Sequence, residues 1–187
     1  MTKRLFVALS IPAADASSFY DLGGAIAGSV NGCRPVVLKE MHVTVRFLGD
    51  VQEGQVAELV EKLEAVAMVS PPLRLDFDAV AFAPFNRPPD MLWATYRGGE
   101  AFSRLVRDVT AATLSFSQER NAHQEMVAHV TMARFSRGLP EALARQTINQ
   151  PSIKPLTADR IFLFESRPTE GGHAYYEMAS FPLKGAI

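Results

Sequence analysis

The sequence is short of cysteine, of long apolar runs and of net charge. Its one cysteine, Cys33, excludes an internal disulfide framework and is typical of a protein in a reducing compartment. No stretch approaches the roughly 20 apolar residues of a transmembrane helix. The first residues, Met1 to Arg4, lead into an apolar strand pattern rather than a signal peptide. These absences predict a cytoplasmic protein without a membrane segment.

The charge balance limits the possible partners. The net charge of the 187 residues is −1, whereas a protein that coats duplex DNA non-specifically is normally basic. Any contact with nucleic acid is therefore expected at a local patch or at one end of a strand. With 48% hydrophobic and 21% charged residues, the composition is that of a globular protein with a substantial core.

One short pattern occurs twice, first as His42-Val43-Thr44-Val45-Arg46 and again as His129-Val130-Thr131-Met132-Ala133. Each copy is typical of a strand, in which alternate side chains share a face. Each copy therefore presents an imidazole and a hydroxyl together, while the intervening apolar residues point into a core. If the two strands lie side by side, two histidines and two threonines meet at one place.

The two copies lie 87 positions apart, and other segments repeat at the same interval. Residues 5–9 correspond to residues 92–96, and residues 75–77 correspond to residues 162–164. In both halves the expected order is strand, helix, His-x-Thr strand, helix, strand. We therefore predict that residues 1–187 form a single bilobal domain of the α+β class, with the two histidines at the junction of two similar lobes.

Hydrophobic periodicity and the positions of proline predict the elements around these motifs. Strands are expected at residues 3–11, 42–47, 73–82, 91–96, 129–134, 156–165 and 174–181. Helices are expected at residues 15–32, 53–70, 102–116 and 140–150. Three glycines of the first helix, Gly23, Gly24 and Gly28, lower its helix propensity, and we expect them to permit close packing on the sheet.

A metal site or a serine triad is poorly supported. His42 and His129 are possible zinc ligands, but a catalytic zinc needs about three protein ligands. No Asp, Glu or Cys shares their face within the motifs, and His123 and His173 lack suitable spacing. A Gly-x-Ser-x-Gly nucleophile motif does not occur. The sequence therefore predicts neither a metal nor another cofactor.

Acid–base chemistry on an anionic substrate fits the motifs better. Histidine titrates near neutral pH, so one imidazole accepts a proton while a second, protonated one donates. In-line displacement at phosphorus needs the attacking and leaving oxygens on opposite sides, where two symmetry-related histidines would stand. The hydroxyls of Thr44 and Thr131 are candidate donors to the phosphate between them.

Two arginines and one aromatic residue are further candidates for substrate binding. Arg46, four residues after His42, shares the face of that histidine on a regular strand. Arg134 lies five residues after His129, so a bulge or the strand end is needed to turn it inward. Phe85 lies in a proline-rich loop beside an arginine, where an aromatic ring either stacks on a base or only anchors the loop.

These motifs give the chain a resemblance to the 2H phosphoesterase superfamily, in particular to the bacterial RNA 2′,3′-cyclic phosphodiesterases, also called 2′-5′ RNA ligases. The resemblance extends over essentially the whole chain and is carried by residues 4–9, 41–49, 128–134 and 176–183. Met41 is a conservative departure, since a leucine usually stands there in the family.

The resemblance implies a fold with two antiparallel-rich sheets around a central cleft and helices outside. It also implies the hydrolysis of RNA 2′,3′-cyclic phosphate ends to 2′-phosphates without a metal. We further expect the protein to be a monomer. His42 and His129 would be catalytic, and Thr44, Thr131 and Arg134 would hold the phosphate. By the same resemblance, His129 is the base for the attacking water and protonated His42 donates to the departing 3′-oxygen.

Other functions remain open at this point. The same chemistry serves ADP-ribose cyclic phosphate, 2′-5′ oligonucleotides and the reverse joining of RNA halves. A nucleotide-binding module without catalysis is a different class, and the presence of both histidines and both threonines argues against it. Turnover of a 2′,3′-cyclic mononucleotide, as opposed to binding without turnover, separates the two classes.

Overall fold

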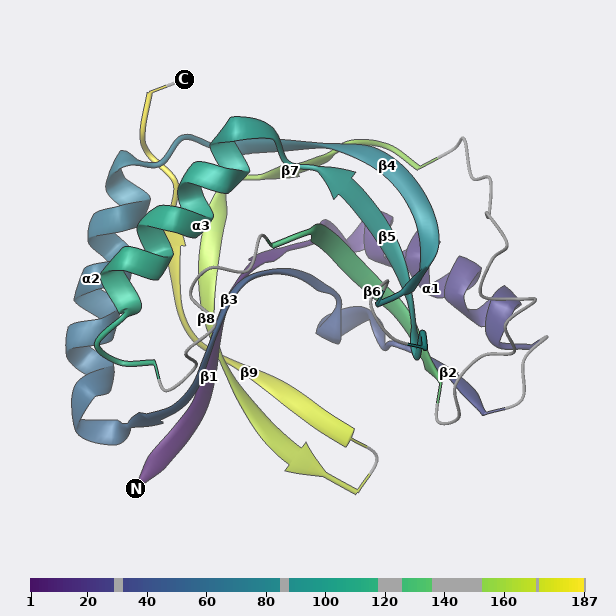
Figure 1. The fold of residues 1–187 in the computed structure, drawn as a ribbon, viewed down its shortest axis with the longest axis horizontal. Coiled ribbons are helices and arrows are strands. Elements are labelled where there is room, and N and C mark those ends of the chain that lie inside the picture. Colours follow the sequence, from purple (N-terminus) through teal and green to yellow (C-terminus); the bar gives the residue numbers. More distant parts are fainter. Residues whose placement is uncertain (29–31, 85–87, 118–125, 136–152, 171, 187) are drawn as a thin grey trace.

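A strongly curved antiparallel sheet organises the chain (Figure 1). The computed structural model describes residues 1–28, 32–84, 88–117, 126–135, 153–170 and 172–186. The strands are β1 (Thr2–Ser10), β2 (Cys33–Pro35), β3 (His42–Gln52), β4 (Leu73–Ala83), β5 (Met91–Arg97), β6 (Ala128–Phe135), β7 (Leu156–Ala158), β8 (Arg160–Thr169) and β9 (Gly172–Pro182). Their spatial order is β7-β4-β5-β6-β3-β1-β8-β9, and β2 pairs with β6. All these pairings are antiparallel, which confirms the predicted α+β class.

Three α-helices lie outside this sheet in the described part of the chain: α1 (Ala13–Ala27), α2 (Val56–Val69) and α3 (Gly99–Thr113). Two short 3₁₀ turns, η1 (Leu38–Glu40) and η2 (Glu53–Gln55), precede β3 and α2. In α2 the residues Leu59, Leu63 and Val66 are buried, at the spacing of one helix face. Figure 1 shows α2 and α3 together over one side of the sheet and α1 at the other end.

The two halves of the sequence exchange elements. Strand β4, which ends the first half, pairs with β5 of the second half. Strand β8, near the end of the second half, returns to pair with β1. The helices do the same, since α1 packs against β6 and α3 packs against β3. Within the described residues the elements follow the predicted order, but each half of the sheet contains strands from both halves of the sequence.

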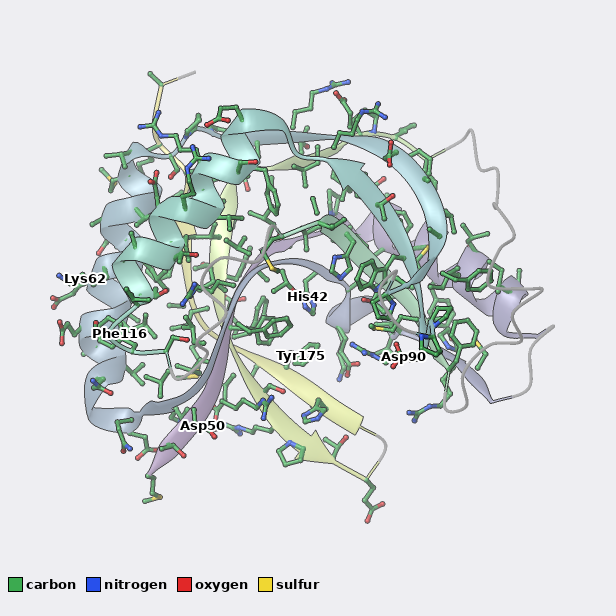
Figure 2. All side chains as sticks on the ribbon, in the orientation of Figure 1. His42, Asp50, Lys62, Asp90, Phe116 and Tyr175 are labelled. Carbon is green, nitrogen blue, oxygen red and sulfur yellow. The ribbon has the colours of Figure 1, made fainter. Side chains whose placement is uncertain are left out.

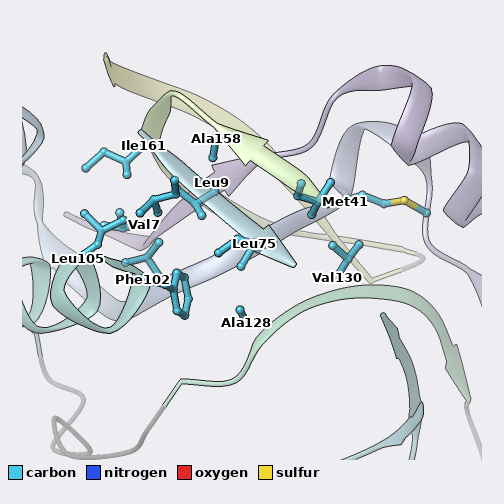
Figure 3. Packing of buried hydrophobic residues seen from close by; sticks show 14 of the residues in the cluster. Val7, Leu9, Met41, Leu75, Phe102, Leu105, Ala128, Val130, Ala158 and Ile161 are labelled. Atoms are coloured by element: carbon cyan, nitrogen blue, oxygen red, sulfur yellow. The ribbon is translucent and has the colours of Figure 1, made fainter. Parts of the chain in front are cut away.

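The core fills the space between the sheet and the helices. Figure 3 shows Phe102 and Leu105 of α3 turned toward Val7 of β1, and all three side chains are at most 3% exposed. Strand β1 carries five consecutive buried residues, because helices cover one of its faces and other side chains cover the second. Burying a side chain of this size contributes about 1.5–3 kcal/mol.

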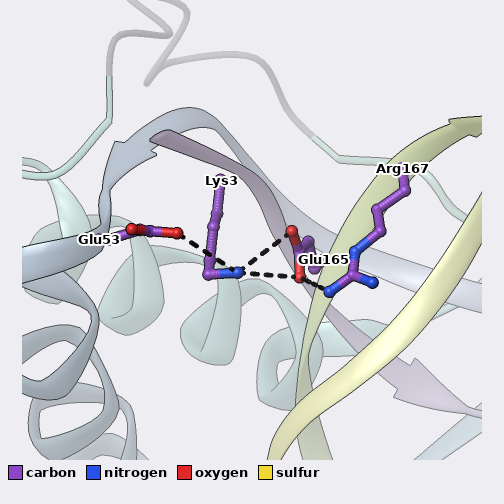
Figure 4. Close-up of polar contacts among 4 residues, drawn as sticks. All are labelled: Lys3, Glu53, Glu165 and Arg167. Atoms are coloured by element: carbon purple, nitrogen blue, oxygen red, sulfur yellow. Dashed lines mark hydrogen bonds and ion pairs between the residues drawn. The ribbon is translucent and has the colours of Figure 1, made fainter. Parts of the chain in front are cut away.

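A group of charged side chains holds the base of the β8–β9 hairpin (Figure 4). Lys3 lies 3.3 Å from the Glu165 carboxylate and 3.8 Å from Glu53, and Arg167 donates to Glu165 at 2.7 Å. The hydrogen bond from Arg167 is the main reason why the pKa of Glu165 is lowered. The Arg167 guanidinium also lies 4.3 Å from the centre of the Tyr176 ring. These contacts tie the hairpin to β1.

Several predicted elements differ in extent from the structure, and one helix cannot be assessed. The strand expected at 42–47 continues to Gln52, and the helix expected at 15–32 is α1, which ends at Ala27. The strand expected at 156–165 divides at Asp159, because β7 pairs with β4 while β8 pairs with β1 on the other side of the sheet. The helix expected at 140–150 lies outside the described residues. Within the described residues, no helix has the length and apolar character that crossing a membrane requires.

The glycines of α1 differ in their surroundings. A Cβ atom on Gly23 would lie 2.7 Å from the Met132 carbonyl oxygen of β6, so the expected close packing on the sheet is confirmed there. It is wrong for Gly24, where a Cβ would meet no atom within 4 Å. At Gly28 a Cβ would meet only carbonyl oxygens of its own helix, the nearer at 3.6 Å.

We predict opposite effects for two alanine substitutions in α1. Gly23→Ala should lower the free energy of unfolding by about 1–3 kcal/mol, because the methyl group must push β6 away. Gly24→Ala, the matched control, should raise it by about 0.5–1 kcal/mol through helix propensity alone. Urea unfolding of both variants measures the difference. Equal stability of the two variants would contradict the close approach of α1 and β6.

Candidate active site

The two halves of the sheet meet at a single residue pair. Strands β3 and β6 are in register only at Val43 and Val130, both of which are almost fully buried. Beyond this pair, β6 continues along β2 and β3 continues along β1. The strands therefore separate on either side of the joint, which opens space beside the two His-x-Thr motifs.

Antiparallel pairing at this joint places each imidazole across from a hydroxyl. His42 lies across from Thr131, and His129 lies across from Thr44. All four side chains line one cavity of about 310 Å³. Figure 2 shows His42 in the hollow of the curved sheet with Tyr175 beside it. The predicted meeting of both motifs in one cavity is confirmed.

Both imidazoles are oriented in the same way by the backbone. His42 Nδ1 lies 2.7 Å from the Glu40 carbonyl oxygen, and His129 Nδ1 lies 2.8 Å from the Val127 carbonyl oxygen. A carbonyl oxygen only accepts, so each Nδ1 must carry a hydrogen and donate it. In the neutral ring Nε2 is then the unprotonated nitrogen, available to accept a proton.

The surroundings lower the proton affinity of both rings. Burial, assisted by the positive charges of His129 and Arg134, lowers the pKa of His42 from 6.5 to about 4. Burial and Arg134 also lower the pKa of His129. In each case the hydrogen bond to a backbone carbonyl opposes the shift but does not cancel it. Both imidazoles therefore stay neutral at a lower pH than an exposed histidine does.

A bulge follows each motif at the same position. Opposite β1 the register skips Val45, and opposite β5 it skips Met132. These residues each lie three positions after the motif histidine. A bulge reverses the face on which the following residues lie. The fifth residue after each histidine, Phe47 or Arg134, therefore lines the cavity.

The bulges determine which of the two predicted arginine side chains lines the cavity. Arg134 lines the cavity, as expected if a bulge turns it inward, and its Nη1 lies 3.3 Å from the Met91 sulfur. Arg46 is buried and pairs with Val7, whose side chain belongs to the core. Paired residues share a face. Arg46 therefore points away from the cavity. The prediction for this residue assumed a regular strand, and the bulge at Val45 interrupts that regularity.

Aromatic side chains that the sequence did not single out surround the histidines. Trp93 of β5 stacks on His129, with ring centres 3.7 Å apart and planes 20° apart. Phe6 and Tyr175 flank His42 at 4.9 Å and 5.2 Å. The interval of 87 positions that relates the motifs also relates Phe6 to Trp93, which was an available signal. No signal in the sequence pointed to Tyr175, because its position beside His42 depends on how the distant β8–β9 hairpin folds.

Three further residues line the cavity, and one predicted residue cannot be assessed. Val36, Glu40 and Met91 also line the cavity. Phe85 lies outside the described residues, so its predicted stacking stays a prediction. Within the residues that the structure places, no group of three His, Cys, Asp or Glu side chains is arranged to hold a metal ion.

Comparison with known proteins finds matches over most of the chain. A family model described as "2'-5' RNA ligase superfamily" matches residues 26–170. An RNA 2′,3′-cyclic phosphodiesterase of Geobacillus stearothermophilus is 32% identical over 155 residues, which are 79% of this chain and 47% of that protein. The chain thus spans about half the length of that relative. A protein of the same name from Aquifex aeolicus is 24% identical, over 79% of this chain and 80% of that protein.

A solved structure shows the same fold. The crystal structure of E. coli LigT complexed with 3'-AMP superposes with a TM-score of 0.74, covering 98% of this chain and 99% of that one. The sequence identity is 17%, so this likeness establishes the fold alone.

The lowered pKa of His42 predicts a loss of stability in acid. The unfolded chain binds a proton at this residue near pH 6.5 and the folded chain only near pH 4. The free energy of unfolding should therefore fall as the pH drops from 6.5 to 4, by roughly 3 kcal/mol at most from this residue. In His42→Asn the loss should be smaller, because the amide does not titrate.

Urea unfolding at pH 7 and pH 4.5 measures this loss. His173→Asn, which removes an exposed imidazole on the β8–β9 hairpin, is the matched control and should lose as much stability as the unsubstituted protein. If His42→Asn loses the same amount as the control, the burial of the neutral imidazole is not a source of acid sensitivity.

Proposed function

The chain belongs to the 2′-5′ RNA ligase superfamily, and from this premise we propose that it hydrolyses RNA 2′,3′-cyclic phosphate ends to 2′-phosphates. The observation that carries the proposal is the joint between β3 and β6. It sets two imidazoles, each with Nδ1 bonded to a carbonyl, in one cavity together with two hydroxyls. The names of the curated relatives support the same reaction.

The reaction needs one neutral and one protonated imidazole. The neutral ring accepts a proton from water at Nε2 while the water oxygen bonds to phosphorus. The bond from phosphorus to the 3′-oxygen breaks, and the protonated ring gives that oxygen its proton. The phosphate stays on the 2′-oxygen. In-line displacement places the attacking and leaving oxygens on opposite sides of phosphorus. Two histidines on the two strands of the joint suit this arrangement.

Three side chains are placed to hold the phosphate. Thr44 and Thr131 each offer a hydroxyl donor beside the histidine of the other strand. Arg134 adds a fixed positive charge and further N–H donors to the cavity. Donors that face the non-bridging oxygens stabilise the charge that accumulates there during displacement.

The base of the terminal nucleotide has aromatic surfaces available. Phe47 is 55% exposed although it lines the cavity, and Tyr175 lines the same space from the hairpin. An exposed aromatic ring stacks on any base, which suits an enzyme that acts on ends of varied sequence. A cavity of about 310 Å³ also suits one nucleotide better than a duplex.

Three further parts of the proposal rest on the sequence. We place the reaction in the cytoplasm because the chain has a single cysteine. We propose that the protein acts as a monomer. We also propose that it needs no metal, since two histidines already supply both proton transfers.

We predict turnover of 2′,3′-cyclic AMP to 2′-AMP. His42→Ala and His129→Ala should each lower kcat/KM by roughly two to four orders of magnitude, the usual contribution of a positioned acid or base. Thr44→Ala and Thr131→Ala should cost less, because each removes one of several donors. Chromatography of the two monophosphates identifies the product.

His173→Ala is the matched control and should retain full activity, because that imidazole lies outside the cavity. Activity should also survive EDTA. Loss in EDTA with recovery on addition of zinc would contradict the mechanism, and predominant 3′-AMP would show that the nucleotide binds the other way round.

A further inference from the structure

A second arginine lies beside Arg134 on the same side of the sheet. Arg34 of β2 pairs directly with Arg134 of β6, and directly paired residues share a face. Both arginines are exposed, whereas Ala133 and Phe135, which flank Arg134, are buried on the opposite face, where α1 packs against both strands. Figure 1 shows β2 alongside the end of β6, with α1 next to them. The two guanidinium groups therefore project from the face that carries the cavity.

Val36 shows where Arg34 lies relative to the cavity. The Val36 N–H donates to the Met132 carbonyl oxygen at 2.8 Å, so the pairing with β6 continues past Pro35. Val36 lines the cavity, and Arg34, two residues earlier, lies on the same face of the extended chain. Arg34 does not itself line the cavity. It thus stands just outside the part of the cavity wall that Val36 and Arg134 form.

The pairing of two arginines has an energetic consequence. Like charges directly opposite each other in a strand pair repel and destabilise it. An anion bound between Arg34 and Arg134 turns this repulsion into attraction. The planar guanidinium group matches the oxygens of a phosphate and donates two parallel hydrogen bonds to it. Arg134 faces the cavity, with its Nη1 3.3 Å from the Met91 sulfur, so Arg34 is placed for a phosphate further out.

Acidic side chains reduce the positive field at this end of the sheet. Glu40 lines the cavity. Asp90 precedes Met91 in the sequence and lies at the end of the hollow where Figure 2 labels it. Both carboxylates oppose the attraction of an anion over a distance. A phosphate at this place must therefore be held by direct contact with a guanidinium group, which a single substitution removes.

An RNA end carries a second phosphate in a suitable position. The terminal nucleotide has its cyclic phosphate on the 2′- and 3′-oxygens, and a phosphodiester on its 5′-oxygen joins it to the rest of the chain. One ribose separates the two groups. On the basis of the function proposed above, we propose that Arg34 binds this 5′ phosphodiester while Arg134 holds the cyclic phosphate. The preferred substrate is then the end of an RNA chain rather than a free cyclic mononucleotide.

Three substrates separate this contact from the chemistry. 2′,3′-cyclic AMP has no 5′-phosphate, its 5′-phosphorylated form has one, and the dinucleotide ApA with a 2′,3′-cyclic end has a phosphodiester and a second nucleoside. In Arg34→Gln the ratio of kcat/KM for the dinucleotide to that for 2′,3′-cyclic AMP should fall roughly 5- to 30-fold, between the effect of an exposed ion pair and that of a charged hydrogen bond. The fall should come from KM, because the 5′ phosphate does not change during the reaction.

The 5′-phosphorylated mononucleotide should show a similar fall relative to 2′,3′-cyclic AMP. Arg104→Gln is the matched control, since it removes the same charge from an exposed arginine of α3, outside the sheet, and should leave both ratios unchanged. Arg34→Lys keeps the charge without the planar group and should recover part of each ratio.

Two results would overturn the proposal. One is an unchanged ratio for the dinucleotide in Arg34→Gln. The other is a fall for the dinucleotide without a fall for the 5′-phosphorylated mononucleotide, because Arg34 would then contact the second nucleoside instead of the phosphate.

Equilibrium binding tests the same contact without turnover. The probes are 2′-AMP and ApA with a 2′-phosphate, and calorimetry measures their binding over a range of salt concentrations. The unsubstituted protein should bind the dinucleotide more tightly than 2′-AMP, and Arg34→Gln should lose that preference. The slope of log K against log[salt] for the dinucleotide should also become shallower by about 0.7, the share of one phosphate contact on a single strand.

This measurement separates the Arg34 contact from the proposed function. If Arg34→Gln keeps the full preference for the dinucleotide, the contact is refuted even in a protein that hydrolyses cyclic phosphates. If the preference is lost in Arg34→Gln but the unsubstituted protein turns over no cyclic phosphate, the contact is supported and only the proposed reaction is contradicted.

Discussion

The register of one residue pair, Val43 with Val130, determines how the site is built. Because β3 and β6 are paired only there, the two halves of the sheet turn toward one another instead of continuing as a broad sheet. Antiparallel pairing at that point crosses the motifs, so each histidine faces the threonine of the other copy. A shift of either strand by one residue would turn the histidine and the threonine of that strand into the core, where an unpartnered polar group costs free energy.

The matched bulges make the two halves of the cavity chemically different, although the His-x-Thr motif is the same in both. Val45 and Met132 occupy equivalent positions, and each turns the fifth residue after its histidine into the cavity. One copy supplies Phe47 and the other supplies Arg134. An apolar ring and a positive charge thus occupy equivalent places on the two motif strands. For the function that we propose, this pair suits a substrate with one charged end and one aromatic end.

The sequence predicted the parts that depend on local pattern. Alternation along residues 42–47 placed His42 and Thr44 on one face, and the repeat supplied their counterparts. It did not predict the direction of Arg46, because Val45 looks like any buried strand residue and a bulge is set by the neighbouring strand. The contacts of Trp93 and Tyr175 depend on strands that are distant in sequence. The break at Asp159 has the same cause, since β7 and β8 find partners on different sides of the sheet.

The central claim is that both imidazoles act on one phosphorus from opposite sides. A crystal structure of the protein with a nucleoside 2′,3′-vanadate tests it most directly, because five-coordinate vanadium mimics the displacement geometry. We expect Nε2 of His42 and Nε2 of His129 each to hydrogen-bond one of the two apical oxygens, with Thr44 and Thr131 on the equatorial ones. A complex in which both histidines contact the same apical oxygen, or in which one points away from vanadium, would contradict it.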